Sequence, residues 1–253
     1  MPITVKVKAN DPAVSAQRAE VAHRVINYYL GLYATESRLL CFLDDQNPPE
    51  FATDSWFPIR GFRKSIHDNT RLAGWPEYLT GCIYVGDIVL RIVDELVYLF
   101  GSTCSGDEVG MTMTLAHELQ HTIQRANARK VWAANTLISG LCGDVIDALK
   151  LNWADIPIEK DARIAAKRVA EDLCGAGRVR DYIHKRIAAP GEDVDDWRFI
   201  LTLKPSDSVD LVTETKMLFN RLRGYRLEVE KVLQGEKCNP DFADLDLNYF
   251  FPT

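Results

Sequence analysis

One stretch constrains this chain more than any other: Thr114 to Ile123, which contains the pattern His-Glu-x-x-His. Every residue around this pattern is uncharged, as a helix buried around a reactive site requires. In a helix, His117 and His121 lie four residues apart and project from one face. Two imidazoles in this arrangement can bind one metal ion. Glu118 directly follows His117 in the chain, so it lies beside the metal, where it can accept a proton from a metal-bound water.

The flanking sequence predicts where this helix begins and ends. Ser105 to Glu108 has the Ser-x-x-Glu spacing of a capping box, which marks a helix start. Arg125, Arg129 and Lys130 lie toward the other end, where cations interact favourably with the helix dipole. The sequence therefore predicts that both histidines lie within one helix between these two groups.

The segment from Thr114 to Ile123 resembles the extended signature of the zincin metallopeptidases, which have an uncharged residue at each flanking position. With one later segment, the resemblance covers about a fifth of the chain. It implies a zinc-dependent hydrolase of peptide bonds with one Zn²⁺ per chain. It also implies that His117 and His121 are metal ligands and that Glu118 is the catalytic general base.

The residues after the second histidine limit which branch of the zincins the chain can resemble. A metzincin would have Gly in place of Gln124 and His in place of Asn127, so that branch is excluded. The glutamate-ligand, or gluzincin-like, branch remains, in which a later helix supplies the third ligand. Ile156 to Ala162 loosely resembles a Pro-x-Glu-x-acidic-Ala stretch found in some bacterial proteins with His-Glu-x-x-His, which makes Glu159 the candidate third ligand.

The third ligand has alternatives. Asp161 lies only two residues after Glu159, about 200° around a helix, so both carboxylates cannot face one ion. Arg163 stands where the thermolysin-type pattern has Asp, and it could simply pair with Glu159 on a solvated surface. His184 is a further candidate ligand. Tyr182 and His184 are the nearest candidates for the group that stabilises the oxyanion, with an ordinary C-terminal helix as the alternative.

Hydrophobic spacing and the resemblance together favour an α+β fold, mostly helical, with a zincin-like core and a small mixed sheet beside the metal-site helix. We expect one domain, residues 1–253, with sub-regions 1–79 (N-terminal helix and aromatic loop region), 80–175 (metal-site core) and 176–253 (C-terminal helical part). Further helices are predicted at residues 13–32, 88–100, 132–150, 157–173, 179–188 and 209–233. Strands are predicted at residues 3–8, 37–43, 80–85 and 199–203, and a long ordered loop at residues 44–78.

Two of these segments depend on weaker signals. The strand at residues 80–85 follows from the resemblance, because zincins have an edge strand beside the active-site helix, where extended substrate can add. Residues 88–100 contain many β-branched side chains, so a strand is the alternative to the predicted helix there.

Composition excludes several classes of protein. The net charge of −6 argues against broad nucleic-acid binding, which favours a basic surface. The first ten residues contain no apolar stretch long enough for a signal peptide. The longest uncharged run, residues 131–143, is too short to span a bilayer, so we expect no membrane insertion. The six scattered cysteines contain no Cys-x-x-Cys pair and are interpreted as reduced thiols of a cytoplasmic protein.

Three functions follow from these patterns. The first is a zinc metallopeptidase whose partner is a peptide or protein substrate. The second is a zincin-like metal-binding regulator or sensor without protease activity. The third is a helical interaction protein in which the His-Glu-x-x-His pattern occurs by chance. The sequence leaves the substrate, the cleavage specificity and the oligomeric state open.

Overall fold

The structure is a computed structural model. It describes residues 3–8, 11–32, 39–44, 61–65, 95–100, 107–138, 141, 143–189, 194–235, 242 and 244–251.

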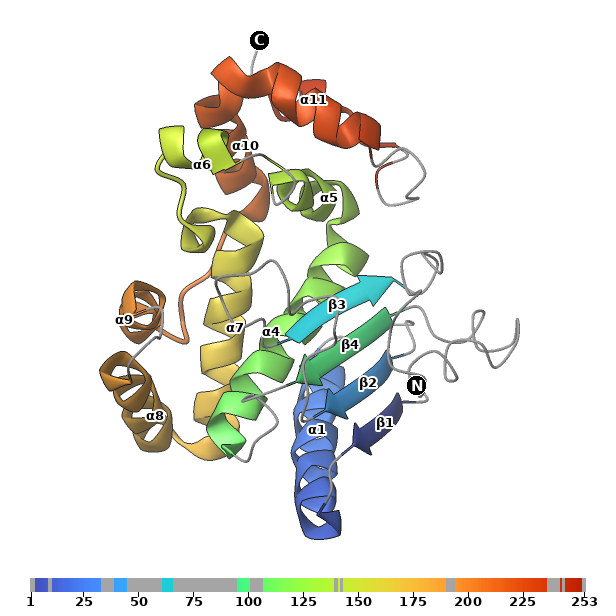
Figure 1. Ribbon diagram of the computed structural model, residues 1–253, viewed down its shortest axis with the longest axis vertical. Helices are drawn as coiled ribbons and strands as arrows, with labels where there is room; N and C mark the ends of the chain where they lie inside the picture. The colour runs from blue at the N-terminus through green and yellow to red at the C-terminus, as the bar shows by residue number, and fades with distance from the viewer. Residues whose placement is uncertain are drawn as a thin grey trace, which may run out of the picture.

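The part of the chain with described side chains is mostly helical (Figure 1). Among these residues, 83% are helical and 1% lie in a strand. The predicted α+β class with a small mixed sheet is therefore corrected to mostly helical. The strand predicted at residues 199–203 was wrong, because these residues belong mainly to the helix α9 (Val194–Thr202). Trp197, Ile200 and Leu203 are buried and recur every three residues, which is helical spacing.

The described residues also include four short strands: β1 (Ile3–Lys8), β2 (Leu39–Asp44), β3 (Gly61–Ser65) and β4 (Glu95–Phe100). They pair in the order β1-β2-β4-β3, in which β1, β2 and β4 are parallel and β3 is antiparallel to β4. In this register, Cys41 of β2 lies opposite Val5 and Val97.

The strands test several predictions. β1 and β2 lie where strands were predicted, at residues 3–8 and 37–43. β3 lies within the predicted loop and β4 within the predicted helix at residues 88–100, so both predictions were wrong at these positions. For β4, the alternative of a strand is confirmed. The sequence of β4, Glu-Leu-Val-Tyr-Leu-Phe, suits a strand between two neighbours, and pairing with distant segments overrides its local helical spacing. The predicted strand at residues 80–85 lies outside the described residues.

Two long helices, α4 (Glu108–Asn127) and α7 (Pro157–Cys174), pack along each other (Figure 1). Helix α4 begins after Asp107, whose side chain accepts hydrogen bonds from the backbone N–H groups of Val109 and Gly110. The N-cap is therefore Asp107, and the predicted capping box that starts at Ser105 is corrected. Helix α7 begins at Pro157, which suits a first helical position, and ends where Gly175 adopts a φ of +91°.

One hydrophobic cluster packs around most of α4 and the second half of α7. It also includes α1 (Pro12–Leu32), α8 (Ala176–Ala188) and α9. Tyr29 of α1 donates a hydrogen bond from its hydroxyl group to the carbonyl oxygen of Ala116, at 2.8 Å. This contact fixes α1 against the backbone residue that precedes the first histidine of the pattern.

A second hydrophobic cluster packs around the beginning of α7 and the C-terminal part of the chain. It includes elements that the sequence predicted as longer helices. The predicted helix at residues 132–150 overlaps two helices, α5 (Arg129–Ile138) and α6 (Gly143–Ala148). The predicted helix at residues 209–233 overlaps α10 (Leu211–Arg221), the 3₁₀ turn η5 (Leu222–Tyr225) and α11 (Arg226–Gly235). Glycine disfavours a helix interior, and Gly143 and Gly224 lie at these interruptions.

We expect Phe219→Ala to destabilise the protein by about 3–5 kcal/mol, the range for removing a large buried aromatic side chain. Phe219 is fully buried, and its ring lies 5.4 Å from that of Phe250 and 5.1 Å from that of Phe251. Chemical denaturation measures the free energy of unfolding. The exposed Met217 on the same helix provides the control, since Met217→Ala should change it by less than about 0.5 kcal/mol. Equal effects would contradict the assignment of Phe219 to this core.

Candidate metal centre

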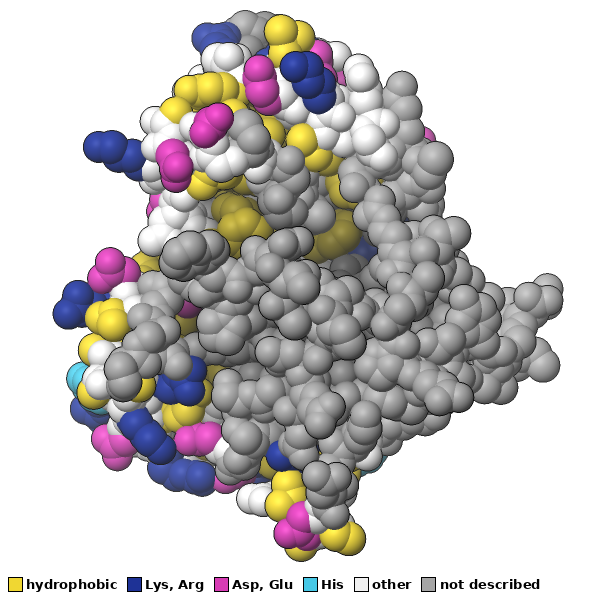
Figure 2. Space-filling model, viewed as in Figure 1, with side chains coloured by type: hydrophobic (Ala, Val, Ile, Leu, Met, Phe, Trp, Pro, Cys, Tyr) yellow, Lys and Arg dark blue, Asp and Glu magenta, His cyan; other side chains and the backbone are white. Residues whose placement is uncertain are grey.

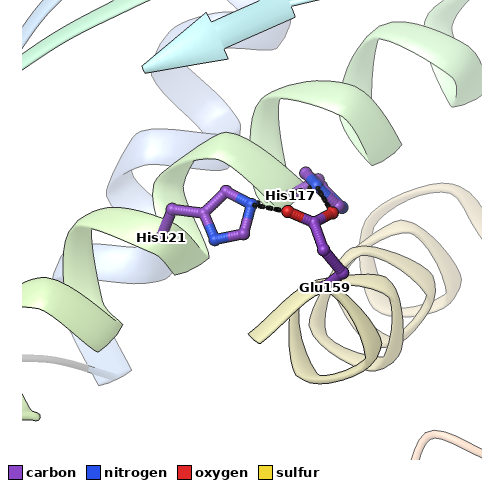
Figure 3. A group of neighbouring side chains, drawn as sticks. All are labelled: His117, His121 and Glu159. Carbon is purple, nitrogen blue, oxygen red and sulfur yellow. Dashed lines mark hydrogen bonds and ion pairs between the residues drawn. The ribbon is translucent and has the colours of Figure 1, made fainter. Parts of the chain in front are cut away.

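Helix α4 presents His117 and His121 on the same face (Figure 3). Their Nε2 atoms are 3.2 Å apart, and their rings meet edge to face with centroids 4.8 Å apart. Leu115 and Ala116 are fully buried in the hydrophobic cluster, and this packing fixes the rotation of the helix. The two imidazoles therefore converge because of helical periodicity and buried neighbours, as the sequence predicted.

Glu159 in the first turn of α7 reaches both histidines (Figure 3). Its Oε2 atom lies 3.2 Å from His117 Nε2, and its Oε1 atom lies 3.3 Å from His121 Nε2. The possible ligand atoms of the three residues all lie within 4.8 Å of one another. Two imidazole nitrogens and one carboxylate oxygen form a donor set that can hold a metal ion.

The three side chains differ in their exposure to solvent. His121 and Glu159 are buried, with 11% and 10% of their side chains exposed, whereas His117 has 21% of its side chain exposed. Solvent therefore reaches the group mainly beside His117.

Burial and charge act in opposite directions on this group. Burial lowers the pKa of His121, but the negative charges and hydrogen bonds around it, first of all those of Glu159, outweigh this effect and raise that pKa above the ordinary 6.5. Burial also raises the pKa of Glu159, but the two histidines hold it well below its ordinary value. The site therefore favours a carboxylate paired with a protonated His121, and a metal cation can replace that proton.

Metal binding is expected to weaken as the pH falls, because the ion must displace the proton on His121. Since the pKa of His121 is raised, this competition extends above pH 6.5. The apparent affinity should rise about tenfold per pH unit for each proton displaced, until the pH exceeds that raised pKa. Competition with a chromophoric chelator across this range measures the affinity. A pH-independent affinity would contradict the involvement of His121.

The raised pKa of His121 also predicts how the stability of the protein depends on pH once a chelator has removed the metal: stability should fall as the pH rises. The stabilisation from charged His121 beside Glu159 is fully present below pH 6.5, and it is lost as the pH rises through the raised pKa of His121. Thermal unfolding of the chelated protein across this range should show a falling midpoint.

Arg163 pairs with Glu159, as the i,i+4 alternative predicted, but the pair is buried rather than solvated. Its Nη1 atom donates to Glu159 Oε2 at 3.3 Å, and its Nε atom donates to Asp196 Oδ1 at 2.8 Å. Arg163 thus links the carboxylate of the triad to α9. This pairing coexists with the contacts of Glu159 to both histidines, so the two roles are not exclusive.

The other candidate residues lie elsewhere. Asp161 accepts hydrogen bonds from the side-chain amides of Gln120 and Gln124 and is not part of the triad. His184 is exposed on α8 and is also outside the triad. Tyr182 packs against Trp197, and its hydroxyl oxygen lies beside Gly110 near the start of α4, away from the histidines.

Glu118 is buried, with 8% of the residue exposed. Its negative charge contributes to raising the pKa of His121, so it lies within electrostatic reach of the triad.

Sequence reasoning missed two contacts of the site, those of Gln124 and of Asp161. The Oε1 atom of Gln124 lies 2.8 Å from His121 Nδ1, and Asp161 binds the amide of Gln124. A signal for the first contact was present, since Gln124 lies three residues after His121 and side chains at this spacing meet on a helix. No sequence signal indicates which residue of α7 faces Gln124.

The remaining predictions receive partial tests. In the described part of the chain, no helix is long and apolar enough to cross a membrane. Cys174 is a buried free thiol, and the other five cysteines lie outside the residues with described side chains. Figure 2 shows acidic and basic side chains interspersed with hydrophobic ones over the described part of one face.

Comparison of the chain with protein-family models, with curated proteins and with solved structures gave no match, so its function is inferred from the chemistry of the triad.

Proposed function

We propose that this protein is a zinc-dependent metallopeptidase that binds one Zn²⁺ through His117, His121 and Glu159. The observation that carries the proposal is the convergence of two imidazoles and one carboxylate from two packed helices. Three protein ligands are typical of catalytic zinc sites, which leave a fourth position for water or substrate, whereas structural sites use four. The exposed side of His117 provides a route for water.

The donor set alone does not select zinc. Two histidines and one carboxylate also suit ferrous iron in oxygenases. Glu118 favours the hydrolytic reading, because a carboxylate next to the first ligand is suited to proton transfer. Calcium and magnesium prefer sites made only of oxygen ligands, so a site with two imidazoles does not suit them.

In this proposal the residues of the chain have distinct roles. Bound zinc would supply Lewis acidity and would lower the pKa of a coordinated water toward 7. Glu118 takes a proton from the water that attacks the peptide carbonyl carbon, and it returns the proton to the amine nitrogen as the C–N bond breaks. Arg163 holds the Glu159 carboxylate in place through its hydrogen bond, while Asp196 fixes the guanidinium group.

Two measurements on the purified chain test the proposal. Elemental analysis should give one zinc per chain. Hydrolysis of an unstructured protein such as casein should be abolished by a chelator and restored by Zn²⁺. Zinc without hydrolysis would favour the metal-binding regulator, and absence of any bound metal would favour a chance occurrence of the His-Glu-x-x-His pattern.

A further inference from the structure

We propose that Gln124 is a positioning residue that fixes the tautomer of His121 and directs its Nε2 atom toward the metal, and that Asp161 holds Gln124 in this role. The inference rests on the proposed metal centre, and it adds a chain of hydrogen bonds from α7 through Gln124 to a ligand on α4.

The contacts of Gln124 use every polar atom of its side chain. Gln124 is almost fully buried, with 2% of the residue exposed. Its Nε2 atom donates to the carbonyl oxygen of Ile158 at 2.9 Å and to Asp161 Oδ2 at 2.8 Å. Its Oε1 atom lies 2.8 Å from His121 Nδ1. Three partners at hydrogen-bond distance allow one orientation of this amide.

Donor and acceptor chemistry fixes that orientation. A carbonyl oxygen and a carboxylate oxygen can only accept, so the group that faces Ile158 and Asp161 must be the NH₂ group of Gln124. Both hydrogens of this group are then used, and the remaining oxygen faces His121. That oxygen can only accept, so His121 must carry its proton on Nδ1. In a neutral imidazole, this leaves the lone pair of Nε2 free for a metal.

This arrangement gives α7 two linked tasks. Glu159 faces the histidines, while Asp161, two residues later, holds the amide that orients one of them. Partners behind metal-ligating histidines commonly contribute about 10- to 100-fold to metal affinity. Asp161, two residues after Glu159, is therefore turned toward the two glutamines and not toward the histidines.

Gln120 provides a matched control. It lies one helical turn before Gln124 and is also buried, and it donates to the same Asp161 oxygen, at 2.8 Å. Among the described residues, the side chain of Gln120 makes no hydrogen bond to His121 or to the rest of the triad. Replacing either glutamine by leucine therefore removes a hydrogen bond to Asp161, but only Gln124→Leu removes the partner of His121.

The first experiment measures Zn²⁺ affinity by competition with a chromophoric chelator at one fixed pH. We expect Gln124→Leu to weaken binding about 10- to 100-fold and Gln120→Leu to change it by less than about threefold. Circular dichroism of each variant verifies that the fold is retained. Equal losses in both variants would assign the effect to packing and overturn the inference, as would no loss in Gln124→Leu.

The second experiment exchanges the two functional groups. Gln124→Glu alone places a carboxylate against Asp161 and the Ile158 carbonyl, so we expect weaker zinc binding. Adding Asp161→Asn lets the new amide at position 161 donate to the new carboxylate at position 124, which still accepts from His121. The double variant should therefore bind zinc more tightly than Gln124→Glu alone. A double variant no better than that single variant would contradict the proposed chain of contacts.

A wild-type measurement decides the tautomer even if a variant fails to fold. Nitrogen-15 NMR of the imidazole groups should show the proton of neutral His121 on Nδ1, protected from exchange, in zinc-loaded protein and in chelated protein at alkaline pH. A proton on Nε2 in the chelated protein would overturn the inference. The chelated sample also separates the two proposals: wild-type protein that does not bind zinc would contradict the metal centre, while the NMR spectrum would still report the tautomer.

Discussion

Glu118→Gln protein is expected to keep its zinc and its fold and to lose peptide hydrolysis by about 10²- to 10⁴-fold, the range for removing a positioned general base. The substitution preserves the shape of the side chain, but the amide cannot accept a proton from water. Because Glu118 is not part of the triad, metal content should remain at one zinc per chain. Initial rates of casein hydrolysis, measured with zinc-loaded protein, give the loss in activity.

A second glutamate on the same helix provides the control. Glu108 lies at the first position of α4, where it pairs with Arg24 and Arg178. Glu108→Gln removes the same charge without touching the triad, so hydrolysis should remain within about twofold of wild type, as expected for a change remote from the reacting groups. Full activity in Glu118→Gln would contradict its role as the base. Loss of both zinc and activity would instead show that Glu118 supports the site structurally.

His117→Ala is expected to weaken zinc binding more than Gln124→Leu does, by more than the roughly 100-fold that the loss of a ligand's hydrogen-bond partner costs. The substitution removes one of three ligands and leaves the carboxylate of Glu159 without one of its two imidazole partners. Dialysis followed by elemental analysis measures the retained metal. The rise in thermal midpoint on adding zinc to chelated protein should also disappear, because binding to the native state causes that rise.

His184→Ala is the matched control for this result, since His184 is an exposed histidine on α8 and was an alternative ligand. It should bind zinc like wild type. Glu159→Gln should resemble His117→Ala, because the amide is a weaker ligand than the carboxylate. Full zinc retention by His117→Ala would show that the site assignment is wrong. Wild-type affinity in Glu159→Gln, together with loss in His184→Ala, would assign the third ligand to His184.

The sequence by itself determined the features that depend on residues close together in the chain. Helical periodicity places His117 and His121 on one face, and uncharged neighbours bury that helix. Pro157 and the alanine-rich segment after it determine where α7 begins and which residues are available to the site. These signals lie within a few helical turns, so they can be read without knowledge of the fold.

Tertiary structure decided the features that depend on distant partners. The rotation of α7 about its axis is set by its packing against α4, and this rotation turns Glu159 toward the histidines and Asp161 toward Gln124. Likewise, β4 is a strand because β2 and β3 pair with it, although its local spacing also suits a helix. A residue's spacing along the chain specifies a face of a helix, but only packing specifies what that face meets.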